Sequence, residues 1–110
     1  MYQHILVPVD GSPTSGRALQ EALRLARQQS AQLELVHVME EARFLDSESY
    51  FNYAELRETM RSSGKKILAQ AQTVAQLAGI AVEVKLLEAS GERIANVIVA
   101  EAKRWPADLI

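Results

Sequence analysis

The sequence predicts an α/β fold built on a parallel sheet. Two apolar runs, residues 5–9 and 33–38, have the length and the Val, Ile and Leu content of buried strands. Residues 13–29 lie between them and repeat apolar side chains at helical spacing. A strand, a helix and a second strand in this order form a βαβ unit, whose strands are parallel and whose crossover is right-handed. At 110 residues, we expect one domain.

The first strand and the turn after it are the most informative stretch. Residues 5–9 are almost continuously apolar, as in a strand covered on both faces, so we expect it in the middle of the sheet. Pro8 cannot donate a ladder hydrogen bond and therefore belongs at the strand's end. Asp10 then follows the carboxyl end, where open α/β sheets bind ligands. Gly11 permits a tight turn, and Ser12 suits the N-cap of the next helix.

Two helices and a long loop are predicted between the strands. The apolar face of the helix over residues 13–29 consists of Ser15, Ala18, Leu19, Ala22, Leu23 and Ala26. Residues 39–52 have no clean period, so we expect a loop beside the ligand-binding end of the sheet. The next helix closes with Gly79 at its C′ position. Its inward face is Leu56, Met60, Gly64, Ile67, Leu68, Ala71, Val74, Ala75 and Ala78. Gly64 there indicates either close packing or a weak point.

The last third of the chain predicts an edge strand, a helix and the start of a fourth strand. Residues 80–86 alternate apolar and polar side chains, which is typical of an edge strand and suggests the strand order 3-2-1. Residues 90–92 are expected to open a helix with Ile94, Val97 and Ile98 inward, and Trp105 before a proline to end it. Residues 107–110 then resemble the opening of a fourth strand, with later strands beyond the first.

The composition narrows the choice of partner and compartment. A formal charge of −2 and a pI near 5.7 disfavour nucleic acid. The chain has no cysteine, which fits a reducing compartment. No apolar stretch approaches the roughly 20 residues that a membrane span needs, and no basic leader precedes the first strand. We therefore expect a cytoplasmic protein without a membrane partner.

The energetics of a missing strand predict a longer natural protein. Burying one Val, Leu or Ile side chain contributes about 1.5 to 3 kcal/mol, so a central strand of about five such residues is worth on the order of 10 kcal/mol. Whole domains have only about 5 to 15 kcal/mol of stability. We therefore expect the natural protein to continue past Ile110.

Several common catalytic and binding motifs are missing from the sequence. It contains neither the dinucleotide fingerprint GxGxxG nor the phosphate-binding loop GxxxxGK[ST]. His4 and His37 have no companion at metal-ligand spacing, so no metal site is expected. Ser12, His37 and Asp10 could be drawn as a triad, but no nucleophile-elbow motif surrounds Ser12, and helix capping explains it better.

Asp10 is the main candidate for a functional residue. A carboxylate at a strand's carboxyl end can accept hydrogen bonds from ribose hydroxyls. The alternative is a carboxylate that only caps its own turn. Val9 and Val38 end neighbouring strands and could seat a planar base, although both also suit a plain core. The residues alone leave these alternatives open.

The order of these pieces resembles the universal stress protein family. The resemblance runs through residues 5–12, Ser15, residues 18–19, residues 35–38, Gly91 before Ile94, and residues 107–110. It implies a Rossmann-like, doubly wound parallel sheet of order 3-2-1-4-5, with the fourth strand only begun here and the fifth absent. Residues 1–110 would then be a single domain, incomplete at its C-terminus. The family is usually dimeric and cytoplasmic and has members that bind ATP and members that do not.

The resemblance also assigns site residues. In ATP-binding members, the positions of Pro8, Val9 and Asp10 line the adenosine end, and that of Val38 contacts adenine. Together with Gly11 and Ser12 they are the predicted nucleotide-binding residues. The phosphate signature GxxGxxxxxxxxxG[ST] is expected immediately beyond residue 110. Many members have proline where this chain has Arg93, a departure outside the nucleotide positions.

The leading functional hypothesis is therefore an ATP-binding regulatory module in the stress response. The alternative is a family member without nucleotide that acts as a dimeric interaction module. A phospho-acceptor receiver domain is disfavoured because Asp10 has no neighbouring acids at the end of its strand. No general base or nucleophile is evident, so slow ATP hydrolysis or autophosphorylation is the most activity expected. The sequence leaves open whether Mg²⁺ accompanies the nucleotide, and a homodimer is the expected partner.

Overall fold

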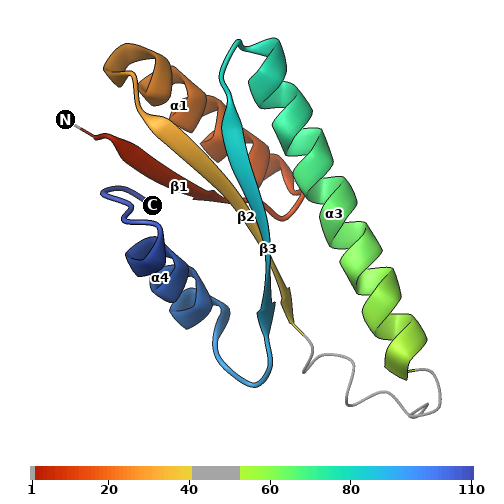
Figure 1. The fold of residues 1–110 in the computed structure, drawn as a ribbon. Helices are drawn as coiled ribbons and strands as arrows, with labels where there is room; N and C mark the ends of the chain where they lie inside the picture. Colours follow the sequence, from red (N-terminus) through yellow and green to blue (C-terminus); the bar gives the residue numbers. More distant parts are fainter. Residues whose placement is uncertain (1, 41–52) are drawn as a thin grey trace.

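A computed structural model describes residues 2–40 and 53–110, and most of the predicted loop over residues 39–52 lies outside the described residues. The sheet contains β1 (His4–Pro8), β2 (Gln32–Glu40) and β3 (Val82–Ala89). The helices are α1 (Pro13–Gln29), α3 (Tyr53–Leu77) and α4 (Ile94–Arg104). The α/β architecture predicted from the sequence is confirmed (Figure 1).

The strands are parallel and lie in the order β1-β2-β3, so the predicted order 3-2-1 is confirmed. Leu6 pairs with Glu34, and Glu34 pairs with Glu83. On the other side of β1, Ile5 forms an isolated parallel bridge with Leu109, whose carbonyl oxygen accepts the Leu6 N–H at 2.9 Å. The C-terminal residues therefore begin to pair beside the first strand, as predicted.

Helices cover both faces of the sheet (Figure 1). On one face, Ile5, Val7, Leu33 and Leu35 pack with buried residues of α1 and α3, among them Leu19, Leu23, Leu68 and Ala75. On the other face, Leu6 and Val36 pack against Trp105 at the end of α4, with Leu87, Ile98 and Ala107 around them. This second, smaller core holds α4 against the sheet.

The structure corrects the predicted strand and helix limits in several places. β2 continues through Glu40, and Met39 is a buried core residue rather than the start of the loop. β3 begins at Val82 and ends at Ala89, later than predicted, and Val84 is exposed. α4 begins at Ile94 with Arg93 as its N-cap, so residues 90–92 do not open it. Gly91 has φ +93°, and this left-handed backbone requires a turn before the helix.

α1 has the predicted limits, but Ala18 on its expected inward face is exposed. Ala18 lies beside Ile5, Leu25 and Leu109 along an apolar hollow of about 240 Å³ at the β1 side of the sheet. The apolar face of α1 extends past β1 there. Helical spacing alone therefore predicts a wider buried face on α1 than the sheet covers. No helix among the described residues is both long enough and apolar enough to cross a membrane.

The end of α3 follows the predicted stop. Gly79 has φ +78°, its N–H donates to Gln76 O at 2.9 Å, and the Ile80 N–H donates to Ala75 O at 3.0 Å. These two bonds form a Schellman motif with glycine at C′.

Candidate functional site

The turn between β1 and α1 places Asp10 at the carboxyl edge of the sheet. Val9 is buried, and its N–H donates to Val36 O at 2.8 Å, which extends the ladder just past Pro8. Gly11 then adopts φ +83°, a left-handed conformation that suits glycine. Ser12 caps α1, because its hydroxyl oxygen accepts the Ser15 N–H at 3.1 Å.

The Asp10 side chain is exposed and held by its own turn. Its Oδ1 accepts the Ser12 N–H at 2.8 Å, while the Asp10 N–H donates to the Ser15 hydroxyl at 3.1 Å. Hydrogen bonds from the side chain and the backbone of Ser12 lower the pKa of Asp10 below its ordinary value. An ionised, oriented carboxylate therefore stands at the rim of the sheet, while its turn limits how far it can move.

His37 connects the ends of the first two strands. Its Nδ1 lies 2.8 Å from Val9 O, and because a carbonyl only accepts, Nδ1 is the protonated nitrogen. The ring lies against α3 at Gly64, where an added Cβ would lie 2.9 Å from His37 Cδ2 and 2.8 Å from Leu86 Cδ1. Gly64 on the buried face of α3 therefore reflects close packing, which settles the alternative that the sequence left open.

Two hollows open at this edge of the sheet. The larger, of about 620 Å³, lies between β2 and α3 and is lined by Asp10, His37 and Val38 with Met60 and Ile67. The smaller, of about 380 Å³, lies between β1, α1 and α4, and the predicted residues Pro8, Val9, Asp10, Ser12 and Val38 line it together with Ile98. Asp10, His37, Val38 and Ile94 line both hollows.

The structure thus brings the predicted site residues together, with Gly11 in the turn itself. Sequence reasoning missed His37, Ile94 and Ile98 as lining residues. Ile94 and Ile98 could have been found, because the helix after β3 also begins at the carboxyl edge of the sheet. From the sequence, His37 is considered only for a metal site and a triad, and neither is favoured. In the structure its ring binds the carbonyl of Val9, which is a predicted site residue.

The triad alternative finds no support in the contacts. The Ser12 hydroxyl caps α1 and the His37 Nδ1 binds the Val9 carbonyl, so both groups engage backbone. Within residues 2–40 and 53–110, no group of three or more His, Cys, Asp or Glu side chains is placed to hold a metal ion. The edge of the sheet presents a carboxylate above an apolar wall, which is an arrangement for binding.

Comparisons of the sequence point to one family. Residues 1–110 match the model of the universal stress protein family. The chain is 34% identical over 119 residues to universal stress protein YxiE of Bacillus subtilis, covering 100% of this chain and 77% of that protein. It is 26% identical over 110 residues to a universal stress protein of Methanocaldococcus jannaschii; the match covers 100% of this chain and 63% of that relative's length.

Solved structures show the same fold. A universal stress family protein from Burkholderia pseudomallei has a TM-score of 0.85 and 31% identity, covering 98% of this chain and 79% of that one. A universal stress protein in complex with cAMP has a TM-score of 0.69 and 25% identity, covering 98% and 74%. One from Archaeoglobus fulgidus in complex with dAMP shares the fold, with a TM-score of 0.72, 24% identity and coverage of 96% and 76%. The chain belongs to the universal stress protein family.

Proposed function

We propose that this protein binds an adenine nucleotide at the carboxyl ends of β1 and β2 and acts as a regulatory module in the stress response. The observation that carries the proposal is the Asp10 carboxylate, which is exposed, oriented by Ser12 and placed on the rim of both hollows. A carboxylate in this position can accept hydrogen bonds from ribose hydroxyls. The family relatives solved with cAMP and dAMP support the same class of ligand.

The base would lie on the apolar wall beneath Asp10. Val38 and Ile94 line both hollows, and Ile98 adds apolar surface from α4. Ligand sites combine such apolar linings with a few placed polar groups, and Asp10 and Ser12 are the polar groups here. Pro8 and Val9 close the β1 side of the smaller hollow.

ATP is the nucleotide that the family resemblance implies, and the polyphosphate is the part of the ligand that the described residues explain least. An exposed Asp10 carboxylate repels a phosphate, so we assign it to the sugar. Its hard oxygen atoms are also the kind that Mg²⁺ prefers, which makes Mg²⁺ a second variable in any binding measurement. A cytoplasmic homodimer completes the proposal.

Isothermal titration with cAMP, AMP and ATP, each with and without Mg²⁺, tests this function. We expect binding by the unmodified protein and a loss of about tenfold or more in affinity for Asp10→Asn, since a charge-assisted hydrogen bond contributes about 1.5 to 3 kcal/mol. Glu21→Gln is the matched control, because it removes an exposed acid from α1 outside both hollows. Equal affinities for Asp10→Asn and the unmodified protein would remove Asp10 from the site.

If none of the three nucleotides binds, the result favours the alternative, a dimeric interaction module without nucleotide. Sedimentation of the same samples then gives the assembly state directly.

A further inference from the structure

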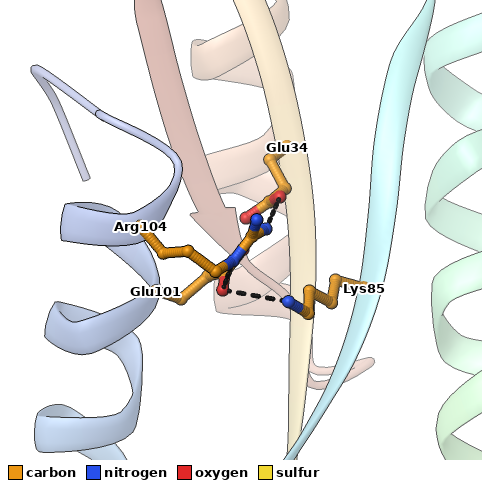
Figure 2. Close-up of polar contacts among 4 residues, drawn as sticks. All are labelled: Glu34, Lys85, Glu101 and Arg104. Carbon is orange, nitrogen blue, oxygen red and sulfur yellow. Dashed lines mark hydrogen bonds and ion pairs between the residues drawn. The ribbon is translucent and has the colours of Figure 1, made fainter.

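Four charged side chains meet between the sheet and α4, on the face opposite α1 and α3 (Figure 2). Glu34 comes from β2 and Glu101 from α4, and their exposures are only 2% and 4%. Lys85 comes from β3 and Arg104 from α4, and their side chains are 40% and 55% exposed. Two carboxyl groups are therefore buried while the two cations reach solvent.

The two carboxyl groups are not partnered equally. Glu101 Oε1 accepts from Arg104 Nε at 2.7 Å and from Lys85 Nζ at 3.3 Å, and its Oε2 accepts from Arg104 Nη2 at 2.5 Å. Glu34 Oε2, by contrast, has a long contact of 3.5 Å with Arg104 Nη2. Among the described residues, no donor reaches the buried Oε1 of Glu34.

A shared proton resolves this imbalance. Two ionised carboxylates facing each other in a buried site repel, whereas one protonated group can donate to its neighbour. Burial, together with the hydrogen bond to Glu101, raises the pKa of Glu34 to about 7. The hydrogen bond from Arg104 lowers the pKa of Glu101 to about 2. Glu34 is therefore the protonated group, and its O–H donates a hydrogen bond to the Glu101 carboxylate.

The same helix forms part of the candidate cleft. Ile94 lines both hollows, and Ile98 lines the smaller one. The second core, around Trp105, is small, so the charged cluster is a substantial part of what holds α4 in place. A change in how α4 sits on the sheet would move the apolar wall opposite Val38.

We propose that Glu34 and Glu101 form a proton-sharing latch that fastens α4 to the sheet, and that loss of the proton loosens α4 and with it the Ile94 wall of the cleft. The latch is fully closed in mildly acidic solution and open once both groups are ionised. Its connection to the cleft rests on the proposed nucleotide-binding function.

Other charged groups face the pair and define the controls. Glu83 of β3 is the direct register partner of Glu34 and is exposed. His4 of β1 lies against Trp105, with 5.0 Å between ring centroids, and Asp108 accepts the His4 N–H at 3.1 Å. Neither Glu83 nor His4 supplies one of the two carboxyl groups that share the proton, so their substitution should leave the latch intact.

Carboxyl ¹³C NMR of the unmodified protein tests the shared proton without any variant. We expect the Glu34 resonance to titrate close to neutral pH and the Glu101 resonance to respond to the same step. Titration of Glu34 near its ordinary value of 4.5 would overturn the proposal.

Hydrogen exchange tests whether the proton fastens α4. Exchange rates of the amides in residues 94–104, divided by those of unstructured peptides at each pH, give protection factors free of the intrinsic pH effect. We expect protection to fall by up to about tenfold per pH unit between 4.5 and about 7, and then to level off. Glu34→Gln, whose amide can donate to Glu101 at every pH, should remove this fall, whereas Glu83→Gln should retain it. A fall that persists in Glu34→Gln, or protection that is constant in the unmodified protein, contradicts the latch.

Affinity for cAMP across the same pH range tests the connection to the cleft, because its phosphodiester keeps one charge throughout. We expect the affinity to change with pH in the unmodified protein and not in Glu34→Gln. Constant affinity beside pH-dependent protection overturns the connection alone. If no adenine nucleotide binds at any pH, the proposed function fails, while the NMR and exchange measurements still decide the latch.

Discussion

The Nδ1 atom of His37 lies 2.8 Å from the carbonyl oxygen of Val9, so one side chain of β2 holds the end of β1 beside Asp10. The bond fixes the peptide that precedes the candidate ligand-binding carboxylate. It also fixes the ring against Gly64 of α3. The His37 side chain thus links the end of β1, helix α3 and the candidate site.

His37→Phe should lose that contact while keeping a ring of similar bulk. We expect the free energy of unfolding in urea to fall by about 1 to 3 kcal/mol, because the carbonyl of the buried Val9 loses its donor. His4→Phe is the matched control, since its ring contact with Trp105 needs no donor. If both variants lose the same stability, the hydrogen bond contributes nothing specific.

Gly64→Ala should be destabilising through overpacking. Its Cβ would lie 2.8 Å from Leu86 Cδ1 and 2.9 Å from His37 Cδ2, so α3 must shift or the His37 ring must move. We expect a loss of about 1 to 3 kcal/mol in urea unfolding. Gly16→Ala in α1 has no atom within 4 Å of the added methyl group and should instead gain roughly 0.5 to 1 kcal/mol. A neutral Gly64→Ala would show that α3 is free to move away from the sheet.

Ser12→Ala should weaken the start of α1. It removes the hydroxyl that accepts the Ser15 N–H, and we expect a cost of about 1 kcal/mol in thermal or urea unfolding. Ser12→Asp restores an acceptor at the cap and should recover most of the loss. Failure of Ser12→Asp to recover it would assign the effect to something other than capping.

The pH dependence of stability should carry the signature of Glu34. Its pKa is raised to about 7 in the folded protein, so the folded state keeps a proton that the unfolded chain releases above 4.5. The stability from this group is complete below 4.5 and is lost as the pH rises through about 7. Glu101, with its pKa lowered to about 2, contributes in the opposite sense and loses its contribution only as the pH falls through about 2.

We therefore expect the free energy of unfolding to decline between pH 4.5 and about 7 by an amount on the order of 1 to 3 kcal/mol. Glu34→Gln should flatten the decline and be more stable than the unmodified protein at pH 8. Urea unfolding at a series of pH values measures both. An identical slope in the variant and the unmodified protein would assign the decline to other groups.

Much of the fold could be predicted because its signals are local. The apolar run before Asp10 gave the first strand, and the alternation over residues 80–86 placed its strand at the edge, although the residue limits moved by a few positions. Gly79 marked the end of α3 because the left-handed backbone at a helix C-terminus involves one residue, and glycine adopts it readily. The predicted start of α4 at residues 90–92 was wrong, because these residues precede the helix. Arg93 is the N-cap and makes no side-chain capping hydrogen bond.

By itself, the sequence determined the strand order, the turn that presents Asp10 and the family, since periodicity and turn chemistry act over a few residues. Only the tertiary structure decided that His37 binds the Val9 carbonyl, that Gly64 admits the His37 ring, and that Glu34 and Glu101 meet in a buried site. The physical reason is that burial and pairing depend on which distant elements pack together. From sequence alone, a glutamate in a strand is expected to be solvated, and only the packing of α4 over the sheet shows that Glu34 is buried.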